Sequence, residues 1–580
     1  MKELLISIYK KLSLKMITIV TLVAVNVYLL TYPSKVLGKI IDLLSNIEQN
    51  KPLIIQNIVS LLAASILLLV VRIIWKYLLA TTTREVEKTL KDKLFDHFLK
   101  IKLSSIQNIK NGELMSYFVK DVGEIRGITY RLLSHASRVI FIISITSFAM
   151  AKINLSLTLA ALCPIAITII IILILKKYIE KSFKKSQKYF TSLSEYVQES
   201  TDAIRTTKAY SGETNQLKKF IKKNKLLKKG NIAVDIYSTL LSNTVMICFG
   251  VCYGITLIYG SKLVLEKIIT IGDFVAFTGY IDLFLTPLFW IPGIISKFER
   301  AVISYHRLEK VFNFEKENLK LEGIGNTQRV HGGITIKNLN FNYPGNIDCI
   351  LDNISIEIKE GETLGIIGTI GSGKTTLMNL LLRLYPVPDG KIFINNQDIN
   401  EIELTTLRNS ISYITQDNFL FSTTIKDNIS LFRENFEDSE IEESTEKSMI
   451  SGEIEKMKNG IYTVIGERGI DLSGGQKQRV VISRAFLNKS NIVIFDDTFS
   501  ALDNKTEKLL LENIKELVKD KTCIIISNRI SDIKDANNII VLDDGKIIEQ
   551  GTHERLLENN MLYTKFYNQQ SSKDEESILN

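Results

Sequence analysis

A glycine-rich segment in the second half of the chain combines the residue types that hold a phosphate group. Its positions are Gly368, Thr369, Ile370, Gly371, Ser372, Gly373, Lys374, Thr375 and Thr376. The glycines let backbone N–H groups wrap around phosphate oxygens, the lysine reaches the terminal phosphates, and the first threonine offers a hydroxyl to Mg²⁺. The apolar run 364–367 before the segment and the helical pattern 377–384 after it supply the strand and helix that such a loop requires. The segment therefore predicts a site for nucleotide phosphates.

A second segment, 491–496, is an apolar run that ends in the carboxylate of Asp496. A strand that ends in this way places a carboxylate beside the phosphate loop, where it contacts Mg²⁺ through water. We therefore expect Thr375 and Asp496 to belong to a magnesium site.

Between these two segments, Leu472 is followed by Ser473, Gly474, Gly475 and Gln476, and this LSGGQ sequence marks a narrower group. With it, the chain resembles an ATP-binding cassette (ABC) transporter, specifically a half-transporter of the exporter type, over nearly its whole length. The resemblance implies ATP and Mg²⁺ as ligands and ATP hydrolysis that drives transport. It also implies an all-α domain with six transmembrane helices, of the type I exporter (type IV) fold, followed by an α/β P-loop nucleotide-binding domain.

Other positions match the family's pattern one by one. Tyr343 matches the aromatic residue that stacks on adenine, although the sequence also allows a buried strand tyrosine there. Gln416 matches the glutamine that contacts Mg²⁺ and the attacking water. Three further groups resemble segments that join the domains or the two subunits: Gly466–Gly469, Ser500–Asp503, and the intracellular loops with Gly112, Glu113 and Asp121 and with Ser192–Ala209.

The resemblance also implies a second chain. In this family two nucleotide-binding domains close head to tail, so that each ATP lies between one chain's phosphate loop and the other chain's LSGGQ segment. Ser473, Gly474, Gly475 and Gln476 would therefore complete a site on the partner.

Two positions depart from the family's pattern. The residue after Asp496 is normally a glutamate that polarises the hydrolytic water, and here it is Asp497. The family's histidine is expected in an Ile-Ser-His-Arg segment, which here reads Ile526, Ser527, Asn528 and Arg529. The shorter carboxylate is withdrawn by about 1 Å, a misplacement that can cost about 10²-fold in rate, and asparagine is never cationic. We therefore expect this chain's own site to bind ATP and hydrolyse it slowly, as in the degenerate subunit of a heterodimeric exporter. Its partner would carry the glutamate and the histidine.

The first half of the chain must supply the membrane domain. We expect spans at about 16–34, 52–72, 132–151, 153–175, 236–261 and 274–296, because each approaches the roughly 20 residues that cross a bilayer core. The third span is less clean, because only the 13 residues from Val139 to Ala151 are free of charge. The sixth span contains Asp282, which should face a cavity or a partner. Residues 1–15 read as an amphipathic helix on the cytoplasmic face, with a frayed basic end as the alternative.

The domain limits follow from these patterns. We expect the transmembrane domain at 1–310, a linker at 311–333, the nucleotide-binding domain at 334–570 and a disordered tail at 571–580. The long basic segments between spans 2 and 3 and between spans 4 and 5 place the N-terminus and the nucleotide-binding domain in the cytoplasm, and the protein in the cytoplasmic (inner) membrane of a bacterium.

Composition limits the partners. The net charge of +9 arises from 72 basic and 63 acidic residues; it could indicate nucleic acid, but lysines that flank membrane spans explain it better. Six spans argue against a soluble ABC-type ATPase that acts on nucleic acid or ribosomes. The expected substrate is a lipophilic or amphipathic small molecule, as in multidrug efflux, and the protein would contact membrane lipid. A homodimeric lipid or peptide exporter and an ATP-sensing membrane regulator remain as alternatives.

Overall fold

The computed structural model describes residues 1–106, 109, 111–317, 330–344, 348–466, 472–499 and 504–579. Two compact units divide the chain. The first contains Met1–Leu99 and Ile109–Phe314, and the second contains Lys100–Asn108 and Glu315–Asn580. The short segment from Lys100 thus belongs with the second unit, although it is surrounded in sequence by the first. Most of the expected linker, 318–329, lies outside the described residues.

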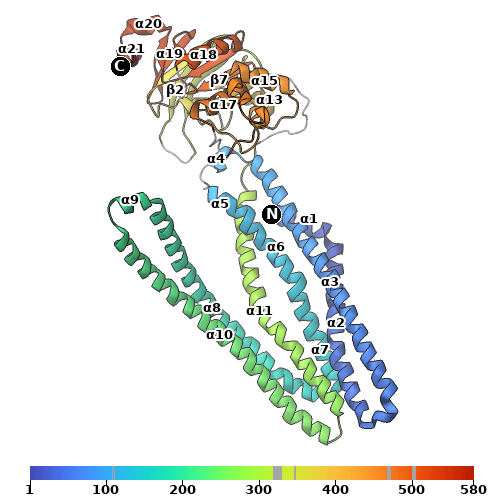
Figure 1. Cartoon of the computed structure of the whole chain (residues 1–580). Coiled ribbons are helices and arrows are strands. Elements are labelled where there is room, and N and C mark those ends of the chain that lie inside the picture. The colour runs from blue at the N-terminus through green and yellow to red at the C-terminus, as the bar shows by residue number, and fades with distance from the viewer. Residues whose placement is uncertain are drawn as a thin grey trace. The chain divides into compact units, whose positions relative to one another are not determined.

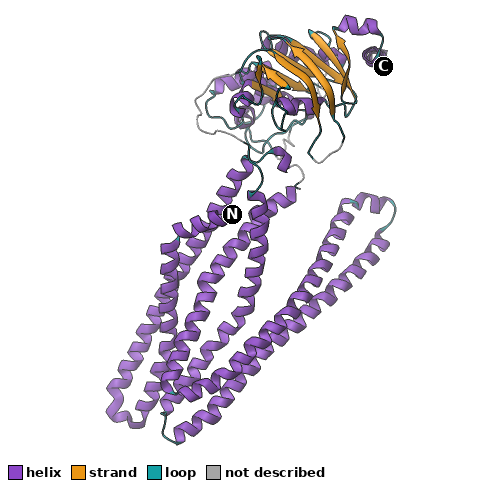
Figure 2. Cartoon of the chain, turned by 180° about the vertical axis from the view of Figure 1, so that it is seen from behind, coloured by secondary structure: helices purple, strands orange, loops and turns teal. Residues whose placement is uncertain are grey.

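The first unit is built from helices in its described part (Figures 1 and 2). In chain order they are α1 (Lys2–Lys11), α2 (Ser13–Leu43), η1 (Leu44–Asn46), α3 (Ile47–Leu99), α5 (Asn111–Ser116), η2 (Tyr117–Asp121), α6 (Val122–Arg131), η3 (Leu132–Ala136), α7 (Ser137–Ile153), α8 (Leu155–Asp202), α9 (Ile204–Ala209), α10 (Glu213–Leu265) and α11 (Ile271–Phe312).

Six helices in the described residues are long and apolar enough to cross a membrane. The third of them is an uninterrupted helical run from Gly112 to Ile153, which contains the expected span 132–151 and extends well before it. This run joins α5, α6 and α7 through two π-helical segments, η2 and η3. It ends where Asn154 adopts an extended backbone and its side chain accepts a hydrogen bond from the Leu157 N–H, which starts α8.

Helices α8 and α10 pack along each other and diverge from the other long helices toward α9 (Figures 1 and 2). Apolar side chains remain exposed on this pair, among them Phe183, Phe190, Val197 and Ile221. The pair therefore presents apolar surface that the described part of this chain leaves uncovered.

The second unit contains two sheets (Figure 2). One has the order β2-β1-β4-β5, and the other has the order β10-β9-β3-β8-β7-β6. The strands are β1 (Ile334–Phe341), β2 (Leu351–Ile358), β3 (Thr363–Gly368), β4 (Ile392–Ile394), β5 (Gln397–Asp398), β6 (Ile411–Ile414), β7 (Ile492–Asp496), β8 (Thr522–Ile526), β9 (Asn538–Asp543) and β10 (Lys546–Gly551). In the six-stranded sheet only the β9–β10 pair is antiparallel.

The second unit also contains helices, which precede, separate and follow the strands along the chain. They are α4 (Leu103–Ile106), α12 (Lys374–Leu381), α13 (Leu404–Ser410), α14 (Ile425–Ser430), α15 (Asp438–Lys447), α16 (Ser451–Glu455), η4 (Gly460–Tyr462), α17 (Gly474–Leu487), α18 (Asn504–Leu517), α19 (Ile530–Ile533), α20 (His553–Asn559) and α21 (Leu562–Leu579). Strands β7 and β8 are buried along their whole length, as the apolar runs of a parallel sheet require.

In the described residues α21 continues to Leu579, through the stretch 571–580 for which the sequence suggests a disordered tail. The polar composition of this stretch suggested disorder, but it lacks helix-breaking glycine and proline and directly continues a helix that is anchored in the unit by the buried Tyr563.

Candidate functional site: a phosphate loop at the edge of a parallel sheet

Four adjacent parallel strands deliver the predicted site residues. The phosphate loop follows β3, Asn528 follows β8, Asp496 ends β7, and Gln416 follows β6. Because the carboxyl ends of parallel strands lie at one edge of a sheet, segments far apart in sequence converge there. The strand order β3-β8-β7-β6 thus explains how the site is assembled.

The phosphate loop has the backbone that its glycines permit. Gly371 and Gly373 have φ angles of +86° and +96°, a region that side chains with a Cβ rarely occupy. The Lys374 ammonium donates to the carbonyl oxygens of Gly368 and Thr369, each at 2.8 Å. Ile370 is almost fully exposed at the tip of the loop.

A polar atom in the loop lacks a partner. The Ser372 hydroxyl is buried and has no hydrogen bond within the described residues. The Thr369 hydroxyl donates to Asp543 Oδ1 at 2.6 Å, which ties the loop to the end of β9. This loop leads directly into the N-terminus of α12, where backbone N–H groups favour an anion. A phosphate group would therefore supply the hydrogen-bond partner that the buried Ser372 hydroxyl lacks.

Thr375 and Asp496 are brought together as the sequence predicts. The Thr375 hydroxyl donates to Asp496 Oδ2 at 3.1 Å, and the Tyr413 hydroxyl donates to the same oxygen at 2.9 Å. Burial raises the pKa of Asp496, and the hydrogen bonds from Tyr413 and Thr375 partly offset that rise. Burial also disfavours the charged form of Lys374 and lowers the pKa of its ammonium group, and the nearby carboxylates of Asp496 and Asp497 partly offset this effect. A hydroxyl and a carboxylate at this distance are a donor set that suits Mg²⁺.

Gln416 and Asp497 also meet. The Gln416 amide Nε2 donates to Asp497 Oδ2 at 3.3 Å. The backbone at Asp497 is left-handed, with φ +46°, and its N–H donates to the Ile526 carbonyl at 2.8 Å. The position of this carboxylate is therefore set by a backbone anchored to the neighbouring strand.

Asn528 lies just after β8, and its side chain is exposed. Its carbonyl accepts a hydrogen bond from the Gln570 amide Nε2 at 2.7 Å, while the Gln570 Oε1 accepts from the Ile530 N–H at 2.9 Å. One glutamine of α21 thus holds both sides of the segment around Asn528. Sequence reasoning missed Gln570, because it lies in a polar stretch without a motif.

Tyr343 lies beyond the end of β1 and is half-buried, so it is not the buried strand tyrosine that the sequence allowed. Its hydroxyl is 2.9 Å from the Thr376 hydroxyl, and its ring packs edge-on against Tyr385 with the centroids 4.9 Å apart. These contacts hold the tyrosine beside the helix that follows the phosphate loop.

The LSGGQ segment begins α17. The Ser473 hydroxyl accepts from the Gln476 N–H at 3.3 Å, and the Gln476 Oε1 accepts from the Ser473 N–H at 2.9 Å, which forms a capping box. Gly474 and Gly475 form the first turn, so that backbone N–H groups face outward at a helix N-terminus. In the described part of the chain no hydrogen bond or ion pair links this segment to the phosphate loop.

The remaining predicted segments divide between described and undescribed residues. Of Gly466–Gly469 only Gly466 is described, and Ser500–Asp503 lies outside the described residues. Gly112 and Glu113 lie in α5, and α9 forms within the second expected loop. Asp121 is buried in the helical unit, where it accepts from the Ser304 hydroxyl at 2.7 Å and pairs with Arg307 at 3.1 Å.

Asp282, in the sixth expected span, is exposed within this chain and accepts a hydrogen bond from the Tyr253 hydroxyl at 2.7 Å. Its carboxylate therefore already has one partner on α10.

Comparisons with known proteins agree with this architecture. Residues 16–288 match the family described as ABC transporter transmembrane region, and residues 351–500 match the family described as ABC transporter. A probable multidrug resistance ABC transporter ATP-binding/permease protein, YheI of Bacillus subtilis (strain 168), is 32% identical over 96% of this chain and 94% of its own length. The alpha-hemolysin translocation ATP-binding protein HlyB of Escherichia coli is 31% identical over 85% of this chain and 70% of its own length. The solved structure of a bacterial Atm1-family ABC exporter with ATP bound superimposes with a TM-score of 0.82 at 22% identity, over 96% of this chain and 99% of that one.

A six-helix transmembrane domain followed by an α/β domain with a phosphate loop and an LSGGQ segment defines an exporter-type half-transporter, and the predicted fold class is confirmed. The chain belongs to the ABC transporter family. It is accordingly a multi-pass membrane protein and an ATP-hydrolysing translocase, and its half-transporter fold implies pairing with another ABC half.

Proposed function

We propose that this chain is one subunit of a heterodimeric exporter that moves a lipophilic or amphipathic substrate across the cytoplasmic membrane. The observation that carries the proposal is the pair Asp497 and Asn528, at the two positions from which the family's catalytic glutamate and histidine act. The N-terminus and the nucleotide-binding domain lie in the cytoplasm in this proposal. The multidrug name of the Bacillus subtilis relative supports the substrate class.

The residues at the sheet edge fit ATP and Mg²⁺. The loop from Gly368 to Thr376 would hold the phosphates and Tyr343 the adenine, while Thr375, Gln416 and Asp496 would hold Mg²⁺. A bound Mg²⁺ supplies positive charge that neutralises the phosphate oxygens. Lys374 contributes a second positive charge from its place on the loop carbonyls.

Hydrolysis at this site is expected to be slow, because the two side chains that would orient and polarise water are short. The Asp497 carboxylate accepts a hydrogen bond from the Gln416 amide, and the Asp497 backbone N–H donates to the Ile526 carbonyl. The carboxylate therefore cannot advance by backbone movement without breaking these contacts. Asn528 offers a neutral amide where an imidazole is the family's choice.

The intact LSGGQ segment gives the chain its second role. Ser473 and Gln476 cap each other, so the first turn of α17 is already ordered for an incoming phosphate. We infer that this turn completes the partner's site, which is the one that turns over. The exposed apolar side chains of α8 and α10 support a partner that covers them.

Two reciprocal variants of this chain test the arrangement in the purified complex with its partner. Ser473→Arg blocks the turn that serves the partner's ATP and should abolish nearly all hydrolysis. Lys374→Ala weakens only this chain's own site. The complex that carries this change should therefore hydrolyse ATP faster than a complex in which the corresponding lysine of the partner is replaced. Equal losses from both lysine changes would contradict the asymmetry.

The same assay separates heterodimer from homodimer. The partner candidate is the product of the neighbouring reading frame. ATP hydrolysis is measured for this chain alone, for the candidate alone and for the two together. We expect ATP hydrolysis to appear in the mixture and to be nearly absent for this chain alone. Brisk hydrolysis by this chain alone would favour a homodimeric exporter.

A further inference from the structure

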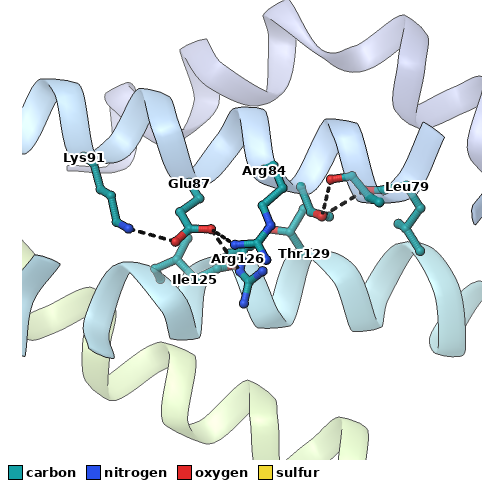
Figure 3. A network of polar contacts seen from close by, with 9 residues as sticks. Leu79, Arg84, Glu87, Lys91, Ile125, Arg126 and Thr129 are labelled. Carbon is teal, nitrogen blue, oxygen red and sulfur yellow. Dashed lines mark hydrogen bonds and ion pairs between the residues drawn. The ribbon is translucent and has the colours of Figure 1, made fainter. Parts of the chain in front are cut away.

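Two groups of cations in the helical unit differ in their partners. One group lies beyond the apolar spans, where Glu87 of α3 pairs with Arg84 and Lys91 of its own helix and with Arg126 of α6, at 2.9, 2.9 and 3.3 Å (Figure 3). These side chains make a paired network that joins two helices. The second group lies within or next to the spans.

The second group gathers around Trp290 of α11. The Arg138 guanidinium of α7 lies over the Trp290 ring, 5.2 Å from its centroid, and the His135 ring of η3 meets the same ring edge-on at 4.9 Å. The Arg131 guanidinium reaches α11 one turn further on, at Gly293. Arg72 of α3 is near enough for its charge to act on Arg138. We call Arg72, Arg131, His135, Arg138 and Trp290 the cationic cluster.

The cationic cluster has donors without acceptors. In the described residues Arg72, Arg131 and Arg138 have no ion pair, and the charges that act on His135 and Arg138 come from arginines of the cluster. The Arg138 Nε is buried and has no hydrogen-bond partner in the part of the chain that the structure describes. The same part offers no partner to the buried indole Nε1 of Trp75, one turn after Arg72. Guanidinium and indole groups only donate hydrogen bonds, so the partner they lack is an acceptor, and an anion matches their charge.

The position of the cluster in the spans points to an amphipathic ligand. Arg72 ends the expected span 52–72, His135 and Arg138 lie in the first turns of 132–151, and Trp290 lies in the last turns of 274–296. All are thus at the same end of their spans, the end from which these helices extend beyond the apolar segments. The π-helical turn η3 carries His135 into the cluster, and such turns are frequent at functional sites. Charges in a span face a cavity or the bundle interior by default.

We propose that the cationic cluster binds the head group of an amphipathic anion, whose apolar part lies along the adjoining spans. The proposal rests on the proposed export function, for which it names the substrate class: a molecule with a phosphate, sulfate or carboxylate head and an apolar body. Arg138 and Arg131 bind the head group, and the Trp290 ring holds the Arg138 guanidinium in position by a cation–π contact.

The chain contains its own reporter for this site, because its two tryptophans are Trp75 and Trp290. The full-length chain in phosphatidylcholine nanodiscs, without nucleotide, is titrated with hexadecyl phosphate while tryptophan emission is recorded. Hexadecyltrimethylammonium and hexadecanol, with the same tail, are the cationic and neutral controls. We expect a saturable change in emission with the phosphate alone.

The variant Arg138→Gln should weaken this response about tenfold or more, because a charge-assisted hydrogen bond is lost. Lys152→Gln is the matched control; Lys152 lies at the other end of α7, over the Phe148 ring, and the variant should respond as the wild type does. ATP binding by each preparation confirms that the variants are folded, and Arg131→Gln provides a second test should Arg138→Gln fail to fold.

Nanodiscs that contain phosphatidylglycerol separate two sources of the head group. If the anionic lipid removes the response to hexadecyl phosphate, the site takes a lipid head group; if it does not, the site takes a free single-chain anion. Equal responses to the three amphiphiles, or an unchanged response in Arg138→Gln, would overturn the proposal. Since no nucleotide is present, failure of the export proposal in the ATPase assay leaves this result unaffected.

Discussion

Asp497→Glu tests whether a missing methylene limits hydrolysis at this chain's own site. The Asp497 backbone is anchored to Ile526 by a 2.8 Å hydrogen bond, so the extra methylene must extend the carboxylate away from the strand. The extension is about 1 Å, and a displacement of that size is worth about 10²-fold in rate, which corresponds to about 2.7 kcal/mol of activation free energy. We therefore expect hydrolysis at this site to rise by up to about 10²-fold, most fully when Asn528→His accompanies the change.

The cost to folding should be small. Asp497 has a left-handed backbone, which aspartate tolerates better than glutamate, so the variant should lose about 1 kcal/mol of folding free energy. ATP hydrolysis is measured at saturating MgATP in the complex with the partner's own site inactivated, and ATP affinity is measured beside it. Asp497→Asn keeps the size and removes the charge, and it should lower the residual rate. A double variant that binds ATP normally and hydrolyses it no faster than the wild type would refute the reasoning.

Three further changes test the supports of the site. Tyr413→Phe removes a hydrogen bond that lowers the pKa of Asp496, so this pKa should rise further. As the pH is lowered, Asp496 should then be protonated earlier, and the variant should lose MgATP binding at a higher pH than the wild type does. A titration of MgATP binding against pH measures this difference. Gln570→Ala removes two hydrogen bonds from the segment around Asn528, worth about 1–3 kcal/mol together, and hydrogen exchange of that segment should accelerate. Gly368→Ala should prevent ATP binding and lower the melting temperature, because a Cβ there would lie 2.0 Å from a carbonyl oxygen of β9.

Each of these changes has a control. Thr415→Ala, two residues after Tyr413, should leave the pH dependence unchanged. Gln550→Ala replaces an exposed glutamine of β10, and hydrogen exchange around Asn528 should stay slow. Gly452→Ala places a Cβ where nothing lies within 4 Å, and it should bind ATP normally. A pH profile unmoved by Tyr413→Phe, equal exchange in the two glutamine variants, or normal ATP binding by Gly368→Ala would contradict the corresponding reasoning.

Much of the nucleotide site could be predicted from the sequence, because its parts are local. The phosphate loop and the capping box of α17 each form from a few consecutive residues, and the structure gives both the backbone that their glycines and serine indicate. The pairing of Thr375 with Asp496 could also be anticipated, since the phosphate loop follows one apolar run typical of a parallel strand and Asp496 ends another.

Contacts between distant segments could not be predicted in this way. Tyr413 meets Asp496 because β6 and β7 are neighbours. Gln570 reaches Asn528 because α21 packs beside the segment that follows β8, a contact between residues 42 positions apart.

The sequence by itself determined the family, the six long apolar segments and the identities of Asp497 and Asn528, because motifs and hydropathy are properties of consecutive residues. Only the tertiary structure decided which cations are paired. In the sequence Arg126 and Arg138 are similar arginines on one helical run. In the structure Arg126 meets Glu87, whereas Arg138 lies over Trp290 and pairs with no acid among the described residues. The physical reason is that a charge finds its partner on a neighbouring helix, and which faces meet depends on how the long helices pack.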